Sequence, residues 1–265
     1  MLLRSWNLFH GNAVPPERHA FLEQMVRLVA DGAEIVCLQE VPLWALRRLE
    51  DWSGMEALPA PAAPARLGPF PSHPELGRIL TDIHHGALRS AFTGQANAIL
   101  VRAPLSVLAT DRLVLNARRF RDAQARALSL GAIARLAWAK ERRVCQTARL
   151  GLPDGRTLVV GNLHTTSFAA DPRLAEAETL RAAVFLDGVA APDEPCVLAG
   201  DFNAHRSARV FEEIAGWGFA LGGHEIDHVL VRGIETGPVE TWPKERRRVD
   251  GRLLSDHAPI EVELG

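Results

Sequence analysis

Carboxylate, amide and imidazole side chains follow several of the apolar segments of this sequence. They are Asn7, Glu40, His164, Asp201, Asn203, Asp227, Asp256 and His257. Such side chains act as general acids, general bases and metal ligands. Burying several carboxylates close together is costly unless a cation or a proton neutralises them. Because oxygen donors dominate and no cysteine is among them, the set favours a hard ion, Mg²⁺ or Mn²⁺, over zinc.

The clearest case is the stretch VLAGDFNA at 197–204, in which an apolar run meets Gly200 and then Asp201 and Asn203. Two residues apart on an extended chain, the acid and the amide point to the same side. Each of the eight residues, taken singly, could instead have a structural role in a turn or at a helix cap, because such roles are common. Whether the eight form a site depends on the elements that carry them.

A strand–helix–strand pattern opens the chain. Residues 2–8 and 34–39 have the apolar character of buried strands. Between them, apolar residues recur at helical spacing. Paired prolines precede this helix, and Gly32 suits its C-terminal end. The second strand leads directly to Glu40.

The same pattern recurs later in the chain. A Pro-Asp-Gly turn is expected to pair a strand over 144–150 with a strand over 157–163. A helical stripe over 172–189 and a strand over 195–199 follow, and this strand leads to Asp201.

Each pattern begins with a strand that carries Asn-Leu and ends with a strand that leads to an acid, which indicates a weak internal repeat. Parallel strands joined by a helix share one end, and ligands bind outside their carboxyl ends. We therefore expect Glu40 and Asp201 at such an edge. The chain is expected to form a single domain, 1–265, with two pseudo-symmetric halves, roughly 1–110 and 144–265.

The region between the halves is less regular. Residues 58–74 are rich in Pro and Ala and predict a surface loop, whereas 97–101 predicts a strand. Residues 116–143 carry eight Arg or Lys against two acids and are expected to be helical around 120–138, with Gly131 interrupting. This basic segment fits either a solvated helix face or a basic lid near an anionic substrate.

The C-terminal part adds a short helix over 208–216 and strands over 225–231 and 258–264. The arginines at 246–248 and Arg252 come just before a Ser-Asp-His sequence. Two interpretations of these arginines remain open, phosphate contacts or a solvated loop.

Composition limits the classes of function. The 265 residues are 47% hydrophobic, with a net charge of −2 and a pI of about 6.6. This balance argues against broad electrostatic binding of nucleic acid but allows a local basic cleft. Three cysteines, Cys37, Cys145 and Cys196, give no disulfide framework. With no signal peptide or membrane-spanning run, we expect a cytoplasmic protein, and no obligate protein partner is indicated.

Six motifs, in order, resemble the endonuclease/exonuclease/phosphatase superfamily, whose members include DNase I-like nucleases. The motifs are WNLFHG, IVCLQE, GNLHTT, LAGDFNA, EIDHVLV and LLSDHAPI. The resemblance spans nearly the whole chain and implies an α/β fold, a four-layer α/β/β/α sandwich of two mixed β-sheets flanked by helices. It also implies metal-dependent hydrolysis of phosphate esters at one rim of the sandwich.

The resemblance implies a role for each of the eight residues. Glu40 would be a metal ligand, supported by Asn7 and Asp256, with Mg²⁺ or Mn²⁺ as the cofactor. The metal would neutralise phosphoryl oxygens and steady the leaving oxygen.

The remaining five residues would be catalytic. His257 would accept a proton from water or hold a phosphate oxygen, and Asp227 would orient its ring. Asp201 would position or deprotonate the attacking water, and Asn203 would donate its amide to a phosphate oxygen. His164 would donate to the phosphate or protonate the leaving group.

Departures from the family pattern reduce the range of expected substrates. Phe9 stands where AP endonucleases have an acid, His164 stands where they have Asn, and the chain has no Tyr. These differences argue against repair of abasic sites. Three functions remain: a phosphodiesterase or nuclease, whose partner would be a phosphoester such as nucleic acid; a hydrolase of a small or lipid-derived phosphoester; and a non-catalytic binding module.

Overall fold

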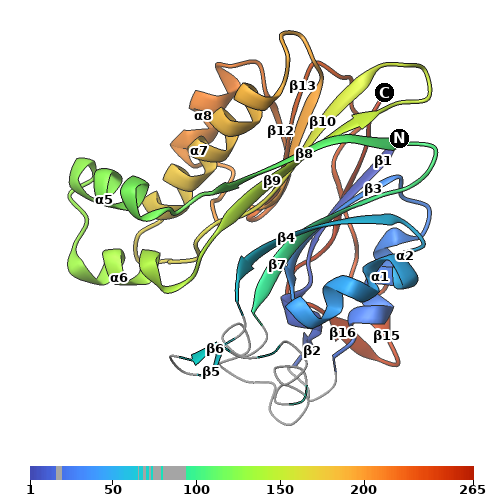
Figure 1. The fold of residues 1–265 in the computed structure, drawn as a ribbon, viewed down its shortest axis with the longest axis horizontal. Helices are drawn as coiled ribbons and strands as arrows, with labels where there is room; N and C mark the ends of the chain where they lie inside the picture. The colour runs from blue at the N-terminus through green and yellow to red at the C-terminus, as the bar shows by residue number, and fades with distance from the viewer. Residues whose placement is uncertain (16–19, 65, 68–69, 72, 74–78, 80–93) are drawn as a thin grey trace. The chain divides into compact units, whose positions relative to one another are not determined.

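The computed structural model describes residues 1–15, 20–64, 66–67, 70–71, 73, 79 and 94–265. These residues contain two six-stranded sheets, and each sheet has both parallel and antiparallel neighbours. Helices cover the sheets (Figure 1). The expected α/β class, with two mixed sheets flanked by helices, is therefore confirmed.

The first sheet has the strand order β14-β17-β1-β3-β7-β4. Its strands are β1 (Leu2–Asn7), β3 (Ile35–Val41), β4 (Glu56–Ala63), β7 (Gln95–Val101), β14 (Glu240–Thr241) and β17 (Ile260–Glu263). β1 and β3 are parallel, as the first strand–helix–strand pattern predicts, and the helix α1 (Leu22–Ala30) lies between them in sequence. Their register sets Asn7 beside Gln39.

The second sheet has the order β12-β13-β11-β10-β9-β8. Its strands are β8 (Ser106–Val114), β9 (Val144–Gly151), β10 (Thr157–His164), β11 (Cys196–Asp201), β12 (Ala220–His224) and β13 (Asp227–Arg232). β10 and β11 are parallel, with the helix α7 (Arg173–Val189) between them in sequence, as the second pattern predicts. Their register sets His164 beside Asp201.

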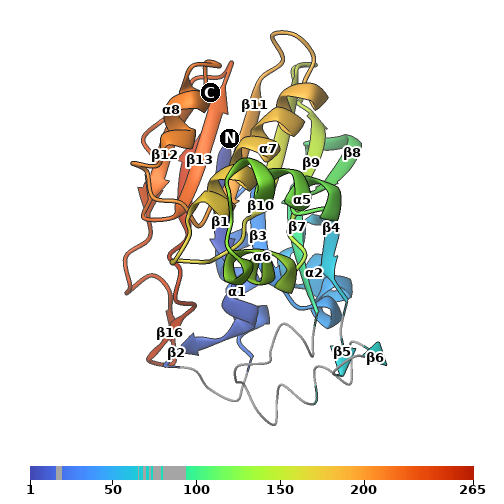
Figure 2. The same cartoon turned by 90° about the vertical axis from the view of Figure 1, so that its left-hand side faces the viewer.

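Each sheet has its own apolar core. The helices α1 and α2 (Leu49–Ser53) pack on the first sheet around Trp6 and Met25. The helices α7 and α8 (Arg209–Ala215) lie on one face of the second sheet, as Figure 2 shows. They pack there around Phe202 and Phe211. β1, β3, β10 and β11 are buried along almost their whole length, which explains their continuous apolar sequences.

Short elements complete the described fold. They are the 3₁₀ helices η1 (Phe9–Gly11) and η2 (Leu43–Arg48) and the strands β2 (Ala13–Val14), β5 (Arg66–Leu67), β6 (Phe70–Pro71), β15 (Arg248–Val249) and β16 (Arg252–Leu254). β15, β16 and β2 form a three-stranded sheet, and β5 pairs with β6.

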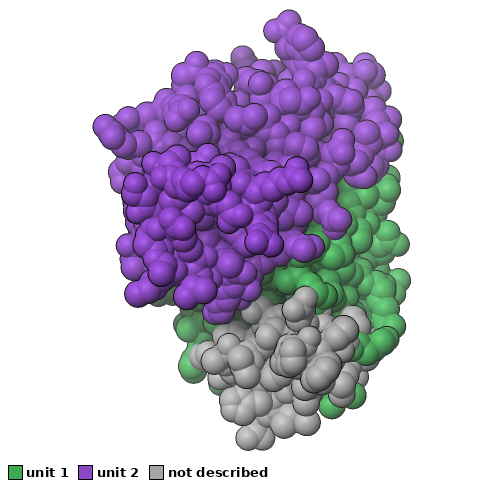
Figure 3. Space-filling view, turned by 60° about the vertical axis from the view of Figure 1, so that its left-hand side comes forward, with its two compact units in different colours: residues 1–106, 236–265 green, residues 107–235 purple. Residues whose placement is uncertain are grey.

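The chain divides into two compact units, which Figure 3 colours separately: unit 1 is 1–106 with 236–265, and unit 2 is 107–235. The C-terminal strand belongs to unit 1 because β17 pairs antiparallel with β1. The units therefore differ in their bounds from the halves inferred at roughly 1–110 and 144–265. The single domain inferred for 1–265 stays a prediction.

The predicted surface loop at 58–74 is wrong at its beginning. Residues up to Ala63 belong to β4, which pairs with β7. Pro59 and Pro61 fit there because β4 is an edge strand, so the missing N–H groups remove no hydrogen bond from a central ladder. Part of the predicted loop, like the residue Pro16 at the predicted helix start, lies outside the described residues.

The predicted helical region with a break is confirmed. The helices α5 (Arg118–Ala127) and α6 (Ala132–Lys140) are separate, and Gly131 is the N-cap of the second. The strands β8 and β12 have no counterpart in the sequence-based prediction. Among the described residues, no helix is both long enough and apolar enough to cross a membrane.

Candidate active site

Two neighbouring parallel strands of unit 2 end in His164 and Asp201. Both residues are buried, with 4% and 1% of their surface exposed. His164 Nε2 lies 3.5 Å from Asp201 Oδ2. The strand ends predicted from sequence thus bring an imidazole and a carboxylate into contact.

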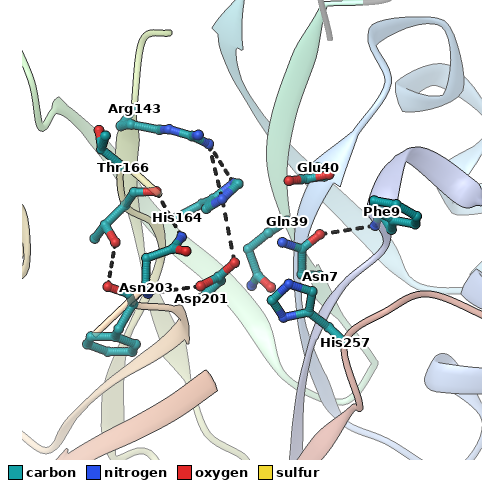
Figure 4. A network of polar contacts seen from close by, with 12 residues as sticks. Asn7, Phe9, Gln39, Glu40, Arg143, His164, Thr166, Asp201, Asn203 and His257 are labelled. Carbon is teal, nitrogen blue, oxygen red and sulfur yellow. Dashed lines mark hydrogen bonds and ion pairs between the residues drawn. The ribbon is translucent and has the colours of Figure 1, made fainter. Parts of the chain in front are cut away.

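Arg143, the residue just before β9, lies next to the His164 ring (Figure 4). Its Nη1 is 3.0 Å from His164 Nδ1 and 3.1 Å from Nε2, and its Nη2 donates to Glu141 Oε2 at 2.9 Å. A guanidinium only donates and an ionised carboxylate only accepts, so the Asp201 carboxylate near Nε2 leads us to assign the tautomer in which Nδ1 accepts from Arg143. The proton on Nε2 then faces Asp201, so the ring has a donor directed at a carboxylate.

Asp227 brings a second buried carboxylate to Asp201. The antiparallel register of β11 and β13 pairs the two residues, and their carboxylate oxygens lie within 4.8 Å of each other. Asp227 is 7% exposed. Two buried carboxylates at this separation repel each other when both are ionised, and a nearby cation relieves that repulsion. Such concentrated charge is more typical of a functional site than of a protein core.

The turns after β10 and β11 are tied together. Asp201 Oδ1 accepts from the Asn203 N–H at 2.9 Å, and Asn203 Nδ2 donates to the Thr165 carbonyl at 3.1 Å. Gly200, with φ of +145°, is required just before this turn, because a Cβ atom there would lie 2.0 Å from the Leu163 carbonyl oxygen. The close approach of the strands therefore depends on glycine.

A buried carboxyl group supports the segment that follows His164. Glu178 of α7 accepts from the Thr166 N–H at 2.7 Å, from Thr166 Oγ1 at 2.8 Å and from Trp138 Nε1 at 2.5 Å. Burial raises the pKa of Glu178 from its usual 4.5, while these hydrogen bonds and the charge of Arg143 act in the opposite direction. Glu178 thus joins α6 and α7 to the end of β10.

Glu40 of unit 1 lies on a β-bulge. The pairing of β3 with β7 shifts register between Leu38 and Val41, and Glu40 has φ of +54°. Its side chain is 19% exposed, and His10 Nε2 lies 3.3 Å from its Oε2. Bulges re-aim side chains next to active sites, and positive φ is uncommon outside glycine. The bulge gives Glu40 a partly exposed carboxylate on an otherwise buried strand.

Asn7 ends β1 and anchors the Ser-Asp-His segment. Its Oδ1 accepts from the Phe9 N–H at 3.0 Å (Figure 4), and its backbone carbonyl accepts from Ser255 Oγ at 2.7 Å. Ser255 Oγ accepts in turn from the His257 N–H at 3.1 Å. Asp256, between these two residues, is exposed. Ser255 and the backbone of His257 are therefore tied to the end of the buried strand β1.

Arg247 holds the same segment through its backbone. Its Nη1 donates to the Ser255 carbonyl at 3.1 Å and to the His257 carbonyl at 2.8 Å, and Trp6 Nε1 donates to the latter at 3.0 Å. Burial lowers the pKa of Arg247, and the charge of Asp256 opposes this effect. Arg247 is therefore neither a residue of a solvated loop nor directed at phosphate in this structure.

Asn7, Glu40 and Asp256, the ligands predicted for Mg²⁺ or Mn²⁺, all carry oxygen donors. Glu40 and Asp256 are carboxylates with accessible surface, and Asn7 contributes an amide oxygen. All three are hard donors, which suits these ions. The identity of the metal stays a prediction, as does the orientation of His257 by Asp227.

Sequence reasoning treated Arg143 only as part of a basic segment. A signal for its contact with His164 was nevertheless present, because the predicted hairpin fixes its register. Leu163 pairs with Cys145, so the end of β10 reaches the residue at which β9 begins. His10 and Glu178 carried no such signal, because only the bulge in β3 brings His10 to Glu40 and only the packing of α7 brings Glu178 to Thr166.

These observations can be compared with known proteins. The family model described as Endonuclease/Exonuclease/phosphatase family matches residues 5–257. The chain belongs to this family. The match includes all eight residues singled out from the sequence. Members of the endonuclease/exonuclease/phosphatase superfamily are phosphoesterases that generally use divalent metals.

Solved structures of the family share the fold over the whole chain. A family protein from Bacteroides vulgatus is 14% identical, with a TM-score of 0.67, and the match covers 100% of this chain and 98% of that one. The mannosyl-6-phosphatase Bt3783 of Bacteroides thetaiotaomicron is 16% identical, with a TM-score of 0.62 and coverages of 100% and 99%. A humanized TDP2 of D. rerio is 12% identical, with a TM-score of 0.61 and coverages of 100% and 98%. No curated protein sequence matches significantly.

Proposed function

We propose that this family member is a Mg²⁺- or Mn²⁺-dependent phosphodiesterase, similar to an endonuclease, that cleaves a P–O bond by in-line attack of water. The observation that carries the proposal is the buried contact between His164 Nε2 and Asp201 Oδ2, 3.5 Å apart. Arg143 Nη1 contacts the same ring, and a carboxylate oxygen of Asp227 lies within 4.8 Å of one of Asp201. An imidazole donor beside paired carboxylates can both give and accept protons, as ester hydrolysis requires.

The residues of unit 2 would carry the proton transfers. Asp201 would accept a proton from the attacking water. As a neutral imidazole, His164 would donate a hydrogen bond from Nε2 to the phosphate, and protonation of the leaving oxygen would require its imidazolium form. Asn203 donates one amide hydrogen to Thr165, which leaves its second hydrogen for a phosphoryl oxygen. No covalent intermediate is proposed, because none of these residues is an activated Ser or Cys.

The residues of unit 1 would hold the metal. Glu40 is the main ligand, and Asn7 and Asp256 support it or its waters. When bound, the metal supplies charge neutralisation at the phosphoryl and leaving oxygens. His257, whose backbone is fixed by Ser255, Trp6 and Arg247, would accept a proton from water or hold a phosphate oxygen, with its ring oriented by Asp227.

A small or lipid-derived phosphoester is the second candidate substrate. The similarity to a structure named as a mannosyl-6-phosphatase, over 100% of this chain, supports it, as does the net charge of −2. The occupied catalytic positions support hydrolysis over a non-catalytic binding module, since a module would not need them.

A phosphoester panel tests the proposal. Plasmid DNA, RNA, bis-p-nitrophenyl phosphate, inositol phosphates, sphingomyelin and a sugar phosphate would be assayed with Mg²⁺, with Mn²⁺ and with EDTA. We expect turnover with either ion, none in EDTA, and nearly complete loss in His257→Ala with an unchanged circular dichroism spectrum. Turnover that survives EDTA, or a fully active His257→Ala variant, would overturn the assignment. The preferred substrate separates the two candidates.

A further inference from the structure

A pocket lies on the α5–α6 hairpin of unit 2. Its volume is about 260 Å³, and its lining includes Arg121, Arg126, Arg135, Asp122 and Trp138. None of these residues is among the eight predicted from the sequence. Three guanidinium groups around one pocket repel each other, and an anion bound among them would relieve that repulsion.

The arginines retain hydrogen-bond donors. Arg135 uses Nε to donate to the Leu130 carbonyl at 2.9 Å, which orients the guanidinium and leaves its two Nη groups without partners among the described residues. Arg126 has no side-chain partner within the same described part of the chain. Within the described part of the chain, the Arg121 side chain makes a single long contact, 3.5 Å from Nη1 to the Trp138 carbonyl. Paired guanidinium forks of this kind match the oxygens of phosphate.

The single acid of the lining does not cancel this charge. Asp122 Oδ2 lies 3.7 Å from Arg118 Nε, one turn earlier on α5, and both side chains are well exposed. The three arginines therefore outnumber one carboxylate that already has a cationic neighbour.

The floor of the pocket is formed by the buried Trp138, which connects to the candidate active site within unit 2. Trp138 is 1% exposed and packs edge-on against Phe120 with ring centroids 5.9 Å apart. Its Nε1 donates to Glu178, which accepts from Thr166, two residues after His164. A ligand that moves Trp138 would therefore act on the segment that carries the catalytic histidine.

We propose that this pocket binds the phosphate monoester group of a small molecule, at a site separate from the hydrolytic residues. The volume suits one phosphate with a small substituent, because pockets for whole drug-sized ligands are typically 300–1,000 Å³. A polyanion that binds through charge alone would contact exposed arginines and lysines across α5 and α6, and it would not require a pocket lined by Trp138. The proposal goes beyond hydrolysis and does not depend on it.

Calorimetric titration with inorganic phosphate in EDTA tests the site while hydrolysis is blocked. The variant Arg126→Ala/Arg135→Ala removes two lining charges. The matched control Arg119→Ala/Lys140→Ala removes two charges from the same helices outside the pocket, where both residues are exposed. We expect wild-type protein and control to bind phosphate, and the pocket variant to bind at least about tenfold more weakly.

Parallel titrations with a short oligodeoxythymidine and with anionic vesicles distinguish the source of the phosphate. Equal weakening of phosphate binding in both double variants, or no weakening in the pocket variant, would overturn the proposal. The proposal would also be overturned if only the oligonucleotide or the vesicles bound and both double variants lost this binding equally. That result would show that binding depends on the total positive charge of the two helices. Loss of phosphate binding confined to the pocket variant supports the proposal whether or not the phosphoester panel shows turnover.

Discussion

The two strand–helix–strand segments of this protein present their acids in different ways. In unit 1, β3 breaks its register at a bulge, and Glu40 emerges with φ of +54° and a partly exposed carboxylate. In unit 2, β11 stays in register with β10, and Asp201 is 1% exposed against His164. The same supersecondary unit thus yields an accessible carboxylate in one case and an enclosed carboxylate–imidazole pair in the other.

This difference indicates a division of labour. An accessible carboxylate can exchange its partner for a metal ion, whereas an enclosed one is suited to holding and moving a proton in a fixed geometry. We therefore expect substitutions in the two segments to have different effects, and the following predictions, from the largest effect to the smallest, test that difference.

Asp201→Asn should lower turnover about 10³-fold, because general acid–base groups contribute roughly 10²–10⁴. The amide oxygen can still accept the Asn203 N–H, so the fold should be retained. Steady-state kinetics and circular dichroism measure both effects. The control Asp187→Asn alters only a surface pair with Arg232 and should leave turnover unchanged. An active Asp201→Asn enzyme would remove the proposed proton-transfer role of unit 2.

Gly200→Ala should lower the free energy of unfolding by about 3 kcal/mol or more, because the new Cβ would lie 2.0 Å from a backbone oxygen in a left-handed conformation. Urea unfolding monitored by circular dichroism measures the loss. Gly188→Ala is the matched control, since nothing lies within 4 Å of its Cβ position on α7 and alanine favours helix. Equal midpoints for the two variants would show that the close approach of β10 and β11 is not needed.

Arg143→Gln should lower turnover by roughly tenfold to a hundredfold, because a charged hydrogen bond of about 1.5–3 kcal/mol to the His164 ring is weakened. The adjacent Arg142→Gln removes the same charge from an exposed position and serves as the control. If both variants lose activity equally, the effect comes from overall charge and Arg143 has no specific role beside His164.

Glu40→Gln should raise the Mg²⁺ concentration for half-maximal activity by at least about tenfold, since loss of even a residue that supports a metal ligand costs 10–100-fold in affinity. Titration of activity with Mg²⁺ measures the shift, and Glu23→Gln, on the exposed face of α1, is the control. Residual activity of Asp201→Asn should show an unchanged Mg²⁺ requirement. The same shift in both site variants would contradict the division of labour.

Stability should decrease as the pH falls below about 6.5, because burial lowers the pKa of His228 from 6.5 in unit 2. The unfolded chain then binds the proton before the folded chain does, with a slope of up to about 1.4 kcal/mol per pH unit. Urea unfolding from pH 7 to pH 5 measures this slope. His228→Gln places an amide N–H near the position of His228 Nε2, which donates to the Ala204 carbonyl, and should reduce the slope. An unchanged slope would assign the titration to another group.

Much of the fold could be predicted because hydrophobic periodicity depends on burial. β1, β3, β10 and β11 are buried along their length and read as continuous apolar runs. Edge strands give weaker patterns, which explains why the Pro-rich β4 was mistaken for a loop and why the largely exposed β8 was not predicted.

The sequence by itself determined the family, the two parallel strand pairs and the eight polar residues at or near strand ends, since motif order and period-based patterns are local properties. Only the tertiary structure decided what those residues contact. It brought Arg143 into contact with the His164 ring and set Glu40 in a β-bulge. It also placed Glu178 where its carboxylate accepts a hydrogen bond from Trp138. Register, bulges and helix packing depend on interactions between segments far apart in the sequence, so no local pattern records them.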